Sequence, residues 1–283
     1  MALKIEEFLH TDRLPHIWCP GCGIGIVTGA FLRVLMSLGL KRENSVVVSG
    51  IGCSSRAANY MDIGTVHSIH GRALAVATGI KMARPDFTVA VFTGDGDGAA
   101  IGGNHLIHAC RRNIDLTCIL FNNQTYGMTG GQTSPTMNLG DRSTTARHGQ
   151  LEPPFDLCRL TQAAGASFVA RGTAGHIRQL EKMIKKGIEH TGFSFVEAVV
   201  PCPTEYGRRN ESGNALAMLD DARARSITKE KADKLPAEEL ADRIVTGILH
   251  EDPEAPEFGQ AYEALVREQA GAEIDTAPKG EKP

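Results

Sequence analysis

The chain has 283 residues, 42% of them hydrophobic and 22% charged, which is enough apolar material for one large core or two modest ones. The formal net charge of −3 leaves no basic surplus that would favour nucleic acid or a membrane surface as a partner. The N-terminal stretch lacks a signal-peptide pattern, and no apolar run approaches the length of a membrane span, so we expect a cytoplasmic protein.

The first motif in chain order is W-C-P-G-C-G at residues 18–23, which holds Cys19 and Cys22. The chain has seven cysteines, and an odd number without a signal peptide indicates reduced thiols. A close pair of this kind is then more typical of a metal or redox site than of a structural disulfide.

Alternating helices and strands follow this motif. Apolar residues at helical spacing predict helices, and short β-branched or continuously apolar runs predict strands. In chain order we expect a helix at 24–39, a strand at 46–48 that breaks at Gly50 and Gly52, a helix at 70–84, a strand at 87–94, a helix at 100–112, a strand at 116–121, further elements at 155–165 and 167–171, a helix at 174–190 and a strand at 193–200. This order predicts an α/β fold, with a parallel sheet that is flanked by helices on both faces.

The sequence changes character after about residue 205. Residues 206–283 are rich in Ala, Glu, Asp and Lys, and we expect a C-terminal arm or tail there, after a main domain at 1–205. Within the arm we predict an amphipathic helix over 235–250, with these apolar residues on one face: Leu240, Ile244, Val245 and Ile248. We expect the end of the chain, 270–283, to be frayed.

Polar side chains follow two strands that we expect to end at the same edge of the sheet. One strand runs into G-D-G-D-G at 94–98, and the next ends in Asn122 and Asn123. Glycines at such strand ends let backbone amides approach a phosphate closely. Asp95, an asparagine oxygen and a backbone carbonyl would suit Mg²⁺, which prefers oxygen ligands. Nicotinamide sites also use glycine-rich turns, so G-D-G-D-G alone does not identify the ligand.

The remaining cysteines fall into two groups. Cys110, Cys118 and Cys158 lie within apolar helix or strand patterns, where cysteine behaves as a small hydrophobic residue. Cys53 and Cys202 each follow a strand end directly, at the edge where we also expect G-D-G-D-G. Together with the W-C-P-G-C-G pair they could form a group of four thiolates, which suits either zinc or an iron–sulfur cluster, and spacing alone does not decide between them.

The interval between the two polar strand ends carries a first resemblance. Twenty-five residues separate G-D-G from N-N, and this arrangement resembles the signature of thiamine diphosphate enzymes, in the half that binds the diphosphate. The resemblance implies thiamine diphosphate with Mg²⁺, and it implies Asp95, Asn123 and the carbonyl of Thr125 as the metal ligands.

Further motifs make the resemblance closer over nearly all of residues 10–210. In order they are W-C-P-G-C-G, G-I-G-C-S-S, H-G-R, G-D-G-D with I-G-G-N-H, R-R-N, Y-G-M-T-G-G-Q with S-P-T, and P-C-P-T. Together they resemble the β subunit of 2-oxoacid:ferredoxin oxidoreductases. The resemblance implies a 4Fe–4S cluster on four ligands: Cys19, Cys22, Cys53 and Cys202. It also implies these cofactor contacts: Ile51, Gly52, Cys53, Ser54, His70, Gly96, Asp97, Gly127 and Met128.

An enzyme of this family decarboxylates a 2-oxoacid oxidatively, forms an acyl-CoA from coenzyme A, and passes the electrons through the cluster to ferredoxin. The chain has no further cysteine run for a ferredoxin-like domain of its own, so a separate ferredoxin is implied. Its length holds only one thiamine-type α/β unit, so we expect an α subunit and a dimer of αβ heterodimers.

Arg56 and His70 are the candidate catalytic residues. Arg56 lies three residues after Cys53 and is a candidate partner for a second substrate carboxylate, which favours 2-oxoglutarate. A salt bridge at a subunit surface would explain Arg56 equally well, and pyruvate or a branched-chain 2-oxoacid are alternative substrates. Two other classes stay open: a non-redox thiamine enzyme with structural zinc, and a non-catalytic iron–sulfur or zinc module.

Overall fold

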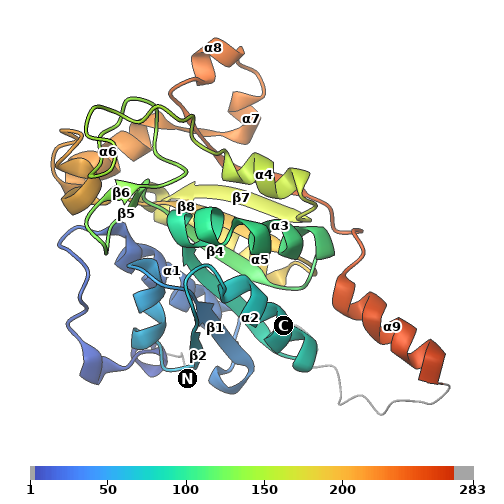
Figure 1. Ribbon diagram of the computed structural model, residues 1–283. Coiled ribbons are helices and arrows are strands. Elements are labelled where there is room, and N and C mark those ends of the chain that lie inside the picture. Colours follow the sequence, from blue (N-terminus) through green and yellow to red (C-terminus); the bar gives the residue numbers. More distant parts are fainter. Residues whose placement is uncertain (1–3, 271–283) are drawn as a thin grey trace.

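The computed structural model describes residues 4–270, and its centre is an eight-stranded sheet. The strands are β1 (Ser45–Ser49), β2 (Gly64–His67), β3 (Thr88–Gly94), β4 (Thr117–Asn122), β7 (Phe168–Thr173), β8 (Ser194–Val199), β9 (Ser226–Thr228) and β10 (Ile244–Glu251). Their order across the sheet is β2-β1-β3-β4-β8-β7-β10-β9 (Figure 1). Neighbouring strands pair in parallel, except that β10 is antiparallel to β7.

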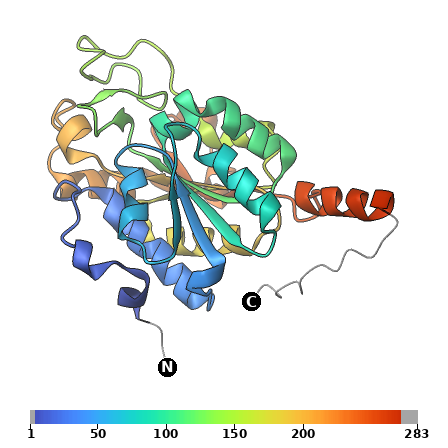
Figure 2. The same cartoon turned by 60° about the horizontal axis from the view of Figure 1, so that its bottom comes forward.

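Helices cover both faces of this sheet. The helices α1 (Gly23–Ser37) and α5 (Ile177–Glu189) pack on one face, and α2 (Ala73–Ala83), α3 (Gly103–Arg112) and α4 (Leu157–Ala163) pack on the other (Figures 1 and 2). Each parallel connection has to cross back over a face of the sheet, and in this chain most of the crossings are helices. The fold is therefore the predicted α/β layering, with helices on both sides of a mostly parallel sheet.

β1 shows why the middle of such a strand, here residues 46–48, is continuously apolar. Val47 belongs to the core beneath α1 and α5, whereas Val46 and Val48 belong to the core beneath α2 and α3. Successive side chains of a strand point to opposite faces, and both faces are covered, so the whole strand is buried.

The elements predicted between residues 24 and 200 are confirmed, with small shifts at their ends. α1 ends just before Gly39, which has a φ of +63° and is suited to terminate a helix. α3 begins at Gly103, later than predicted, because a separate π-helical turn, η5 (Gly96–Ile101), follows G-D-G.

The predicted amphipathic helix over 235–250 is wrong. A short helix, α8 (Ala237–Leu240), is followed by strand β10, which pairs with β7 and β9. Ile244 and Ile248 have helical spacing, but their β-branched side chains favour a strand. Gly247 has a φ of +118°, which an α-helix does not allow, and β7 offers an edge with backbone partners. The segment after residue 205 thus adds two strands to the sheet.

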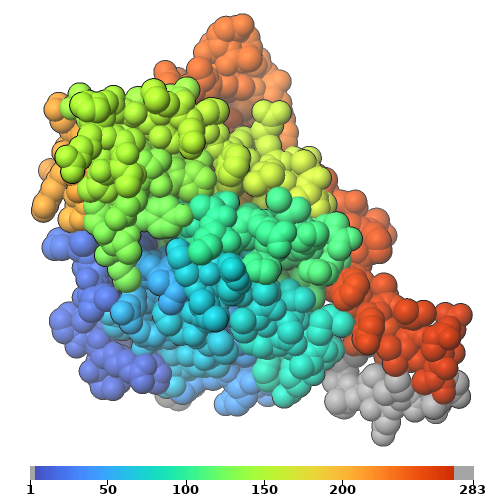
Figure 3. Space-filling model, in the orientation of Figure 1, coloured from blue at the N-terminus to red at the C-terminus, as the bar shows by residue number. Residues whose placement is uncertain are grey.

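The remaining elements surround this core. They are the helices α6 (Ala215–Arg225), α7 (Lys229–Ala232) and α9 (Phe258–Ala270), the short strands β5 (Thr125–Tyr126) and β6 (Gln132–Thr133), and the single turns η1 (Ile5–Phe8), η2 (Thr11–Arg13), η3 (Arg42–Asn44), η4 (Ser54–Tyr60), η6 (Ala174–His176) and η7 (Pro203–Gly207). α9 projects from the body, whereas the irregular segment between β6 and α4 covers the upper left of the surface in Figure 3. Within residues 4–270, no helix combines the length and apolar character that a membrane span requires. The predicted frayed end, apart from Ala270, lies outside the described residues.

Candidate active site at the carboxyl edge of the sheet

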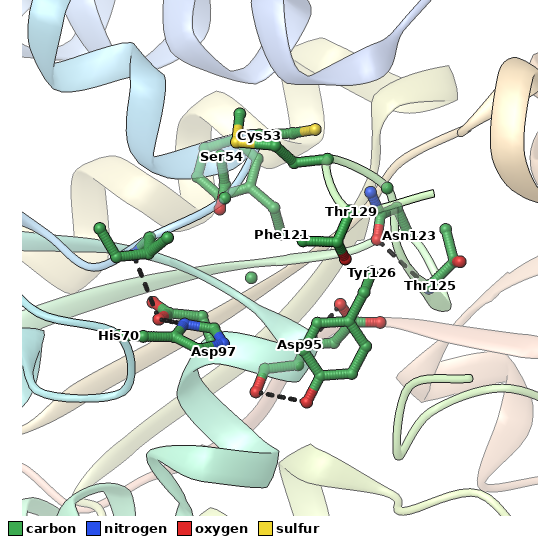
Figure 4. Close-up of a pocket in the computed structure, with 16 residues that line it drawn as sticks. Cys53, Ser54, His70, Asp95, Asp97, Phe121, Asn123, Thr125, Tyr126 and Thr129 are labelled. Carbon is green, nitrogen blue, oxygen red and sulfur yellow. Dashed lines mark hydrogen bonds and ion pairs between the residues drawn. The ribbon is translucent and has the colours of Figure 1, made fainter. Parts of the chain in front are cut away.

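The parallel strands β1, β3, β4 and β8 all end at one edge of the sheet, and the predicted site residues gather there. One pocket opens among the segments that follow β1, β2, β3 and β4 (Figure 4). Its lining consists of Ile51, Gly52, Cys53, Ser54, His70, Gly94, Asp95, Gly96, Asp97, Phe121, Asn123, Thr125, Tyr126, Gly127, Met128 and Thr129. This lining contains every predicted cofactor contact and all three predicted magnesium ligands.

Asp95 lies at the end of β3 with a carboxylate that is only 2% exposed. Its Oδ1 accepts the backbone N–H of Gly96 at 2.9 Å, and its Oδ2 accepts the hydroxyls of Ser134 at 2.8 Å and Thr136 at 2.6 Å. Burial raises the pKa of Asp95 to about 6, and the hydrogen bonds from Thr136 and Ser134 oppose that rise. The two hydroxyls thus hold the carboxylate in the wall of the pocket.

Asp97 connects three loops at the opposite side of the pocket in Figure 4. Its Oδ1 accepts the backbone N–H groups of Ile51 at 3.2 Å and Gly71 at 2.7 Å, and it lies 2.5 Å from Nδ1 of His70. Its Oδ2 accepts the hydroxyl of Thr93 at 2.6 Å. Because Nδ1 is held by Asp97, Nε2 is the ring nitrogen of His70 that is available in the pocket.

The N-N pair forms a tight turn after β4. The Oδ1 of Asn122 accepts the N–H of Gln124 at 3.2 Å, and the Oδ1 of Asn123 accepts the N–H of Thr125 at 3.4 Å. Gln124 has a φ of 61°, an unusual value for a residue other than glycine, and these local hydrogen bonds stabilise it. The turn brings Asn123 and Thr125 into the same lining as Asp95.

Sequence analysis assigned no role to Tyr126, Ser134 or Thr136. Tyr126 donates its hydroxyl to the carbonyl of Gly96 at 3.1 Å, and a Cβ at position 96 would lie 2.3 Å from the Tyr126 ring. Glycine at position 96 is therefore required by the close approach of an aromatic ring. The available signals were the Y-G-M-T-G-G-Q and S-P-T motifs, which contain these residues.

The W-C-P-G-C-G loop joins two distant segments beside the pocket. The N–H of Cys22 donates to the carbonyl of Cys19 at 3.0 Å, which closes the loop into a turn. The N–H of Gly23 donates to the carbonyl of Pro201 at 3.3 Å, and Nε1 of Trp18 donates to the carbonyl of Cys53 at 2.8 Å. These bonds draw the cysteines of three segments together.

Gly21, between the two cysteines of the loop, allows this docking. It has a φ of +79°, and a Cβ at this position would lie 2.2 Å from Cβ of Ala215 in α6. Any other residue would be strained and would push the loop away from α6.

The four predicted cluster cysteines interact with one another. Every pair among Cys19, Cys22, Cys53 and Cys202 interacts electrostatically. Burial raises the pKa of Cys22 to about 12 and of Cys53 to about 11, and the neighbouring thiols add to both rises. Burial also raises the pKa of Cys202. All of these effects favour neutral thiols until a cation binds them.

Gly127, which lines the pocket, lies against two of the thiols. A Cβ at this position would lie 3.4 Å from Sγ of Cys53 and 3.7 Å from Sγ of Cys202. Among residues 4–270, no group of three or more His, Cys, Asp or Glu side chains has the arrangement of a site for a single metal ion. The cysteines that we predicted to be structural are buried in the core: Cys110, Cys118 and Cys158.

Arg56 is not part of the pocket lining. It lies in η4, two residues after Ser54, and is half-buried. Among the described residues it has no hydrogen-bond or ion-pair partner. The structure therefore brings together all the candidate site residues except this one.

Comparisons with known proteins find a matching family and similar proteins for this chain. The family model described as thiamine pyrophosphate enzyme, C-terminal TPP binding domain, matches residues 50–198. The 2-oxoglutarate synthase subunit KorB of Methanocaldococcus jannaschii is 52% identical over 260 residues, which cover 92% of this chain and 96% of that protein. The 2-oxoacid:ferredoxin oxidoreductase subunit beta of Saccharolobus solfataricus is 35% identical over 274 residues, which cover 92% and 88%. A solved structure of 2-oxoglutarate:ferredoxin oxidoreductase from Magnetococcus marinus, with 2-oxoglutarate, coenzyme A and succinyl-CoA bound, matches with a TM-score of 0.85 at 34% identity and covers 97% of this chain and 93% of that chain.

Proposed function

The chain belongs to the β subunits of the thiamine diphosphate-dependent 2-oxoacid:ferredoxin oxidoreductases, and we propose that the 2-oxoacid it oxidises is 2-oxoglutarate. A relative named 2-oxoglutarate synthase subunit shares 52% of the aligned residues, and the solved neighbour holds 2-oxoglutarate, coenzyme A and succinyl-CoA. The proposed reaction converts 2-oxoglutarate and coenzyme A into succinyl-CoA and CO₂, and two electrons leave to ferredoxin.

The observation that carries this proposal is the contact between two sites. The pocket with Asp95 and Asn123 and the group of four thiols share Cys53, and the pocket-lining Gly127 lies against Cys202, since a Cβ there would be 3.7 Å from its Sγ. A decarboxylation site that must release electrons needs an electron acceptor at this short range. Neither a structural zinc site nor a non-redox enzyme would require the two sites to share a residue.

Thiamine diphosphate binds this domain in the family, and we assign its Mg²⁺ to Asp95, Asn123 and the carbonyl of Thr125. These groups supply carboxylate, amide and carbonyl oxygens, the ligands that Mg²⁺ prefers. The buried carboxylate of Asp95 supports the assignment, because no cationic side chain of the described residues pairs with it and a metal ion would stabilise its ionised form. The remaining proposed cofactor contacts come from the 51–54 loop and from His70, Gly96, Asp97, Gly127 and Met128.

We assign a 4Fe–4S cluster to Cys19, Cys22, Cys53 and Cys202. The raised pKa values of the buried members describe thiols without a cation, and bound iron would reverse that preference and keep them as thiolates.

Bound thiamine diphosphate supplies an electron sink for decarboxylation, and a bound cluster supplies a one-electron acceptor. The chain contributes the surroundings. Asp97 holds the ring of His70 so that its Nε2 can give or take a proton in the pocket. Tyr126 packs against Gly96 and closes the pocket wall against water on that side.

Arg56 is the proposed partner of the distal carboxylate of 2-oxoglutarate. A half-buried arginine without an anionic partner, close to the pocket-lining Ser54, is suited to bind an anion that arrives with the substrate. We expect Arg56→Gln to lower kcat/KM for 2-oxoglutarate by about tenfold or more while iron content stays unchanged. An unchanged kcat/KM would assign Arg56 to a subunit surface.

The proposed partners are an α subunit, ferredoxin as the electron acceptor, and coenzyme A as the acyl acceptor. The β-subunit names of the relatives support the α partner, and we propose a dimer of αβ heterodimers that works in the cytoplasm. This chain holds a single thiamine-type unit, which is consistent with an α subunit that supplies the other part of the site.

The test is the visible spectrum and iron content of the chain, purified without oxygen together with its α subunit. Brown absorption with about four iron atoms per chain, which bleaches with 2-oxoglutarate and coenzyme A and persists with pyruvate, is the expected result. Cys202→Ala should lose the iron, whereas the control Cys110→Ala should retain it. A colourless, zinc-containing protein would exclude the redox mechanism, and bleaching with pyruvate alone would exclude the proposed substrate.

A further inference from the structure

A buried charge interrupts the apolar strand β8. Glu197 is only 2% exposed, although its strand lies in the middle of the sheet. Arg171 stands opposite it on β7, and Nε of Arg171 donates to Oε2 of Glu197 at 2.6 Å. Arg171 also donates from Nη2 to Oδ1 of Asp156 at 2.6 Å, at the start of α4.

Fold stability alone does not account for this pair. Two charges lose their hydration on burial, and apolar side chains of similar size are often as stabilising at such a position. The second oxygen of Glu197 points to another role, because Oε1 accepts Nδ2 of Asn122 at 2.6 Å.

Asn122 is the first residue of the N-N turn, and the Glu197 contact sets the orientation of its amide. An ionised carboxylate only accepts hydrogen bonds, so the amide nitrogen of Asn122 has to face Glu197 and its oxygen has to face the turn. That oxygen accepts the N–H of Gln124 at 3.2 Å, and it lies 2.9 Å from Oγ1 of Thr136, whose single hydroxyl hydrogen it shares with Oδ2 of Asp95. Thr136 in turn holds Oδ2 of Asp95 at 2.6 Å.

The contacts form one continuous path from the buried pair to the proposed metal ligands. One branch supports the turn at Gln124, whose φ of 61° needs support, and so positions Asn123 and Thr125. The other branch reaches Asp95 through Thr136. Both branches begin at the amide oxygen of Asn122.

We propose that Glu197 is a positioning residue for the Mg²⁺ and diphosphate site, and that it acts through the side chain of Asn122. Arg171 holds the other oxygen, Oε2, of Glu197 and makes no hydrogen bond of its own with the turn, so among the described residues only Glu197 reaches Asn122 from this pair. The inference rests on the proposed function, since it concerns the same magnesium site.

The experiment measures Mn²⁺ binding to the metal-free chain, held with its α subunit and saturating thiamine diphosphate, from the loss of the free Mn²⁺ EPR signal. Glu197→Gln should weaken Mn²⁺ binding about ten- to a hundredfold, because the amide of Asn122 is no longer oriented by an anion. Arg171→Gln, the matched control, should lower the thermal unfolding midpoint and leave Mn²⁺ affinity within about twofold of wild type.

Asn122→Ala separates positioning from a general loss of structure. If Glu197 acts through Asn122, the double variant Glu197→Gln/Asn122→Ala should bind Mn²⁺ no more weakly than Asn122→Ala alone. Losses that multiply would show that the two side chains act independently and would overturn the inference. Equal weakening by Arg171→Gln and Glu197→Gln would also overturn it, as a sign of general destabilisation.

A second variant covers the case in which Glu197→Gln does not fold. Replacing both buried charges, in Arg171→Met/Glu197→Met, avoids an unpaired charge and should preserve the fold, but it still removes the acceptor of Asn122. The same loss of Mn²⁺ affinity is expected, and wild-type affinity would refute the inference. A wild-type chain that binds no Mn²⁺ would refute the proposed metal site itself, so the two failures are distinct.

Discussion

Asp95 and Asp97 lie two residues apart, yet their hydrogen bonds give them different tasks. A carboxylate has about four acceptor positions. Asp97 uses four of them within the protein, on Ile51, His70, Gly71 and Thr93. Asp95 accepts the N–H of Gly96 and the hydroxyls of Ser134 and Thr136, and the backbone of Gln124 also stabilises its charge. Asp97 is therefore held by donors that include His70, whereas all the donors of Asp95 are neutral groups.

Two partners of Asp97 should respond differently to substitution. Thr93→Val leaves Oδ2 of the buried carboxylate without a donor, so the free energy of unfolding should fall by about 1–3 kcal/mol while thiamine diphosphate affinity is retained. His70→Ala removes a side chain that is 33% exposed and lines the pocket, so affinity should fall about tenfold with little loss of stability. Thermal unfolding and cofactor titration measure the two effects, and the opposite pattern would assign His70 to the fold.

A strand or helix could be predicted from the sequence where its own pattern of apolar residues is enough to determine its conformation. α5 is such an element, since its buried positions follow the helix period, and β1 is another, since its short β-branched run is buried on both faces. β10 could not be predicted, because its apolar spacing fits a helix and only the free edge of β7 makes it a strand. Local pattern fails where a partner far along the chain decides the conformation.

The residues of the candidate site also divide into those that a local sequence pattern marks and those that it does not. Asp95, Asn123 and the four proposed cluster cysteines could be singled out because their spacing or their strand-end positions are visible in the chain. The hydroxyls of Ser134 and Thr136 lie 39 and 41 residues from Asp95 in the sequence, beyond α3 and β4, and no local pattern marks such a contact. The buried Glu197–Asn122 contact is hidden in the same way, since the two residues meet only through adjacent strands.

Gly247 gives a direct test of β10 as a strand. In a strand with a φ of +118°, Gly247→Ala introduces a strained backbone and should lower the free energy of unfolding by about 1–3 kcal/mol. In a helix the same change would raise it by up to about 1 kcal/mol. Gly79→Ala, at an exposed site inside α2 with nothing within 4 Å of the added Cβ, is the control that should stabilise. Stabilisation by both variants would contradict the strand.

Across the whole molecule, the cysteines divide between the carboxyl edge of the sheet and its core. Cys19 is exposed and the other three proposed cluster ligands are partly buried at the edge, whereas Cys110, Cys118 and Cys158 are enclosed between sheet and helices. Along this edge, solvent exposure therefore increases from Cys53, which lines the pocket, to Cys19 at the surface. Such a gradient suits a site that receives electrons on its inner side and delivers them on its outer side.

This gradient predicts an order of reaction with iodoacetamide at pH 8 in the iron-free chain. Cys19 should be alkylated first, and Cys22 and Cys53 more slowly, because burial raises their pKa values to about 12 and about 11 and leaves little thiolate. The core cysteines should react only after unfolding, since they are buried and burial raises their pKa values further. Mass spectrometry of timed samples measures the order, and rebuilding the cluster should protect all four ligands together. A core cysteine that reacts as fast as Cys19, or a cluster ligand that stays reactive after iron is restored, would contradict this division of the thiols.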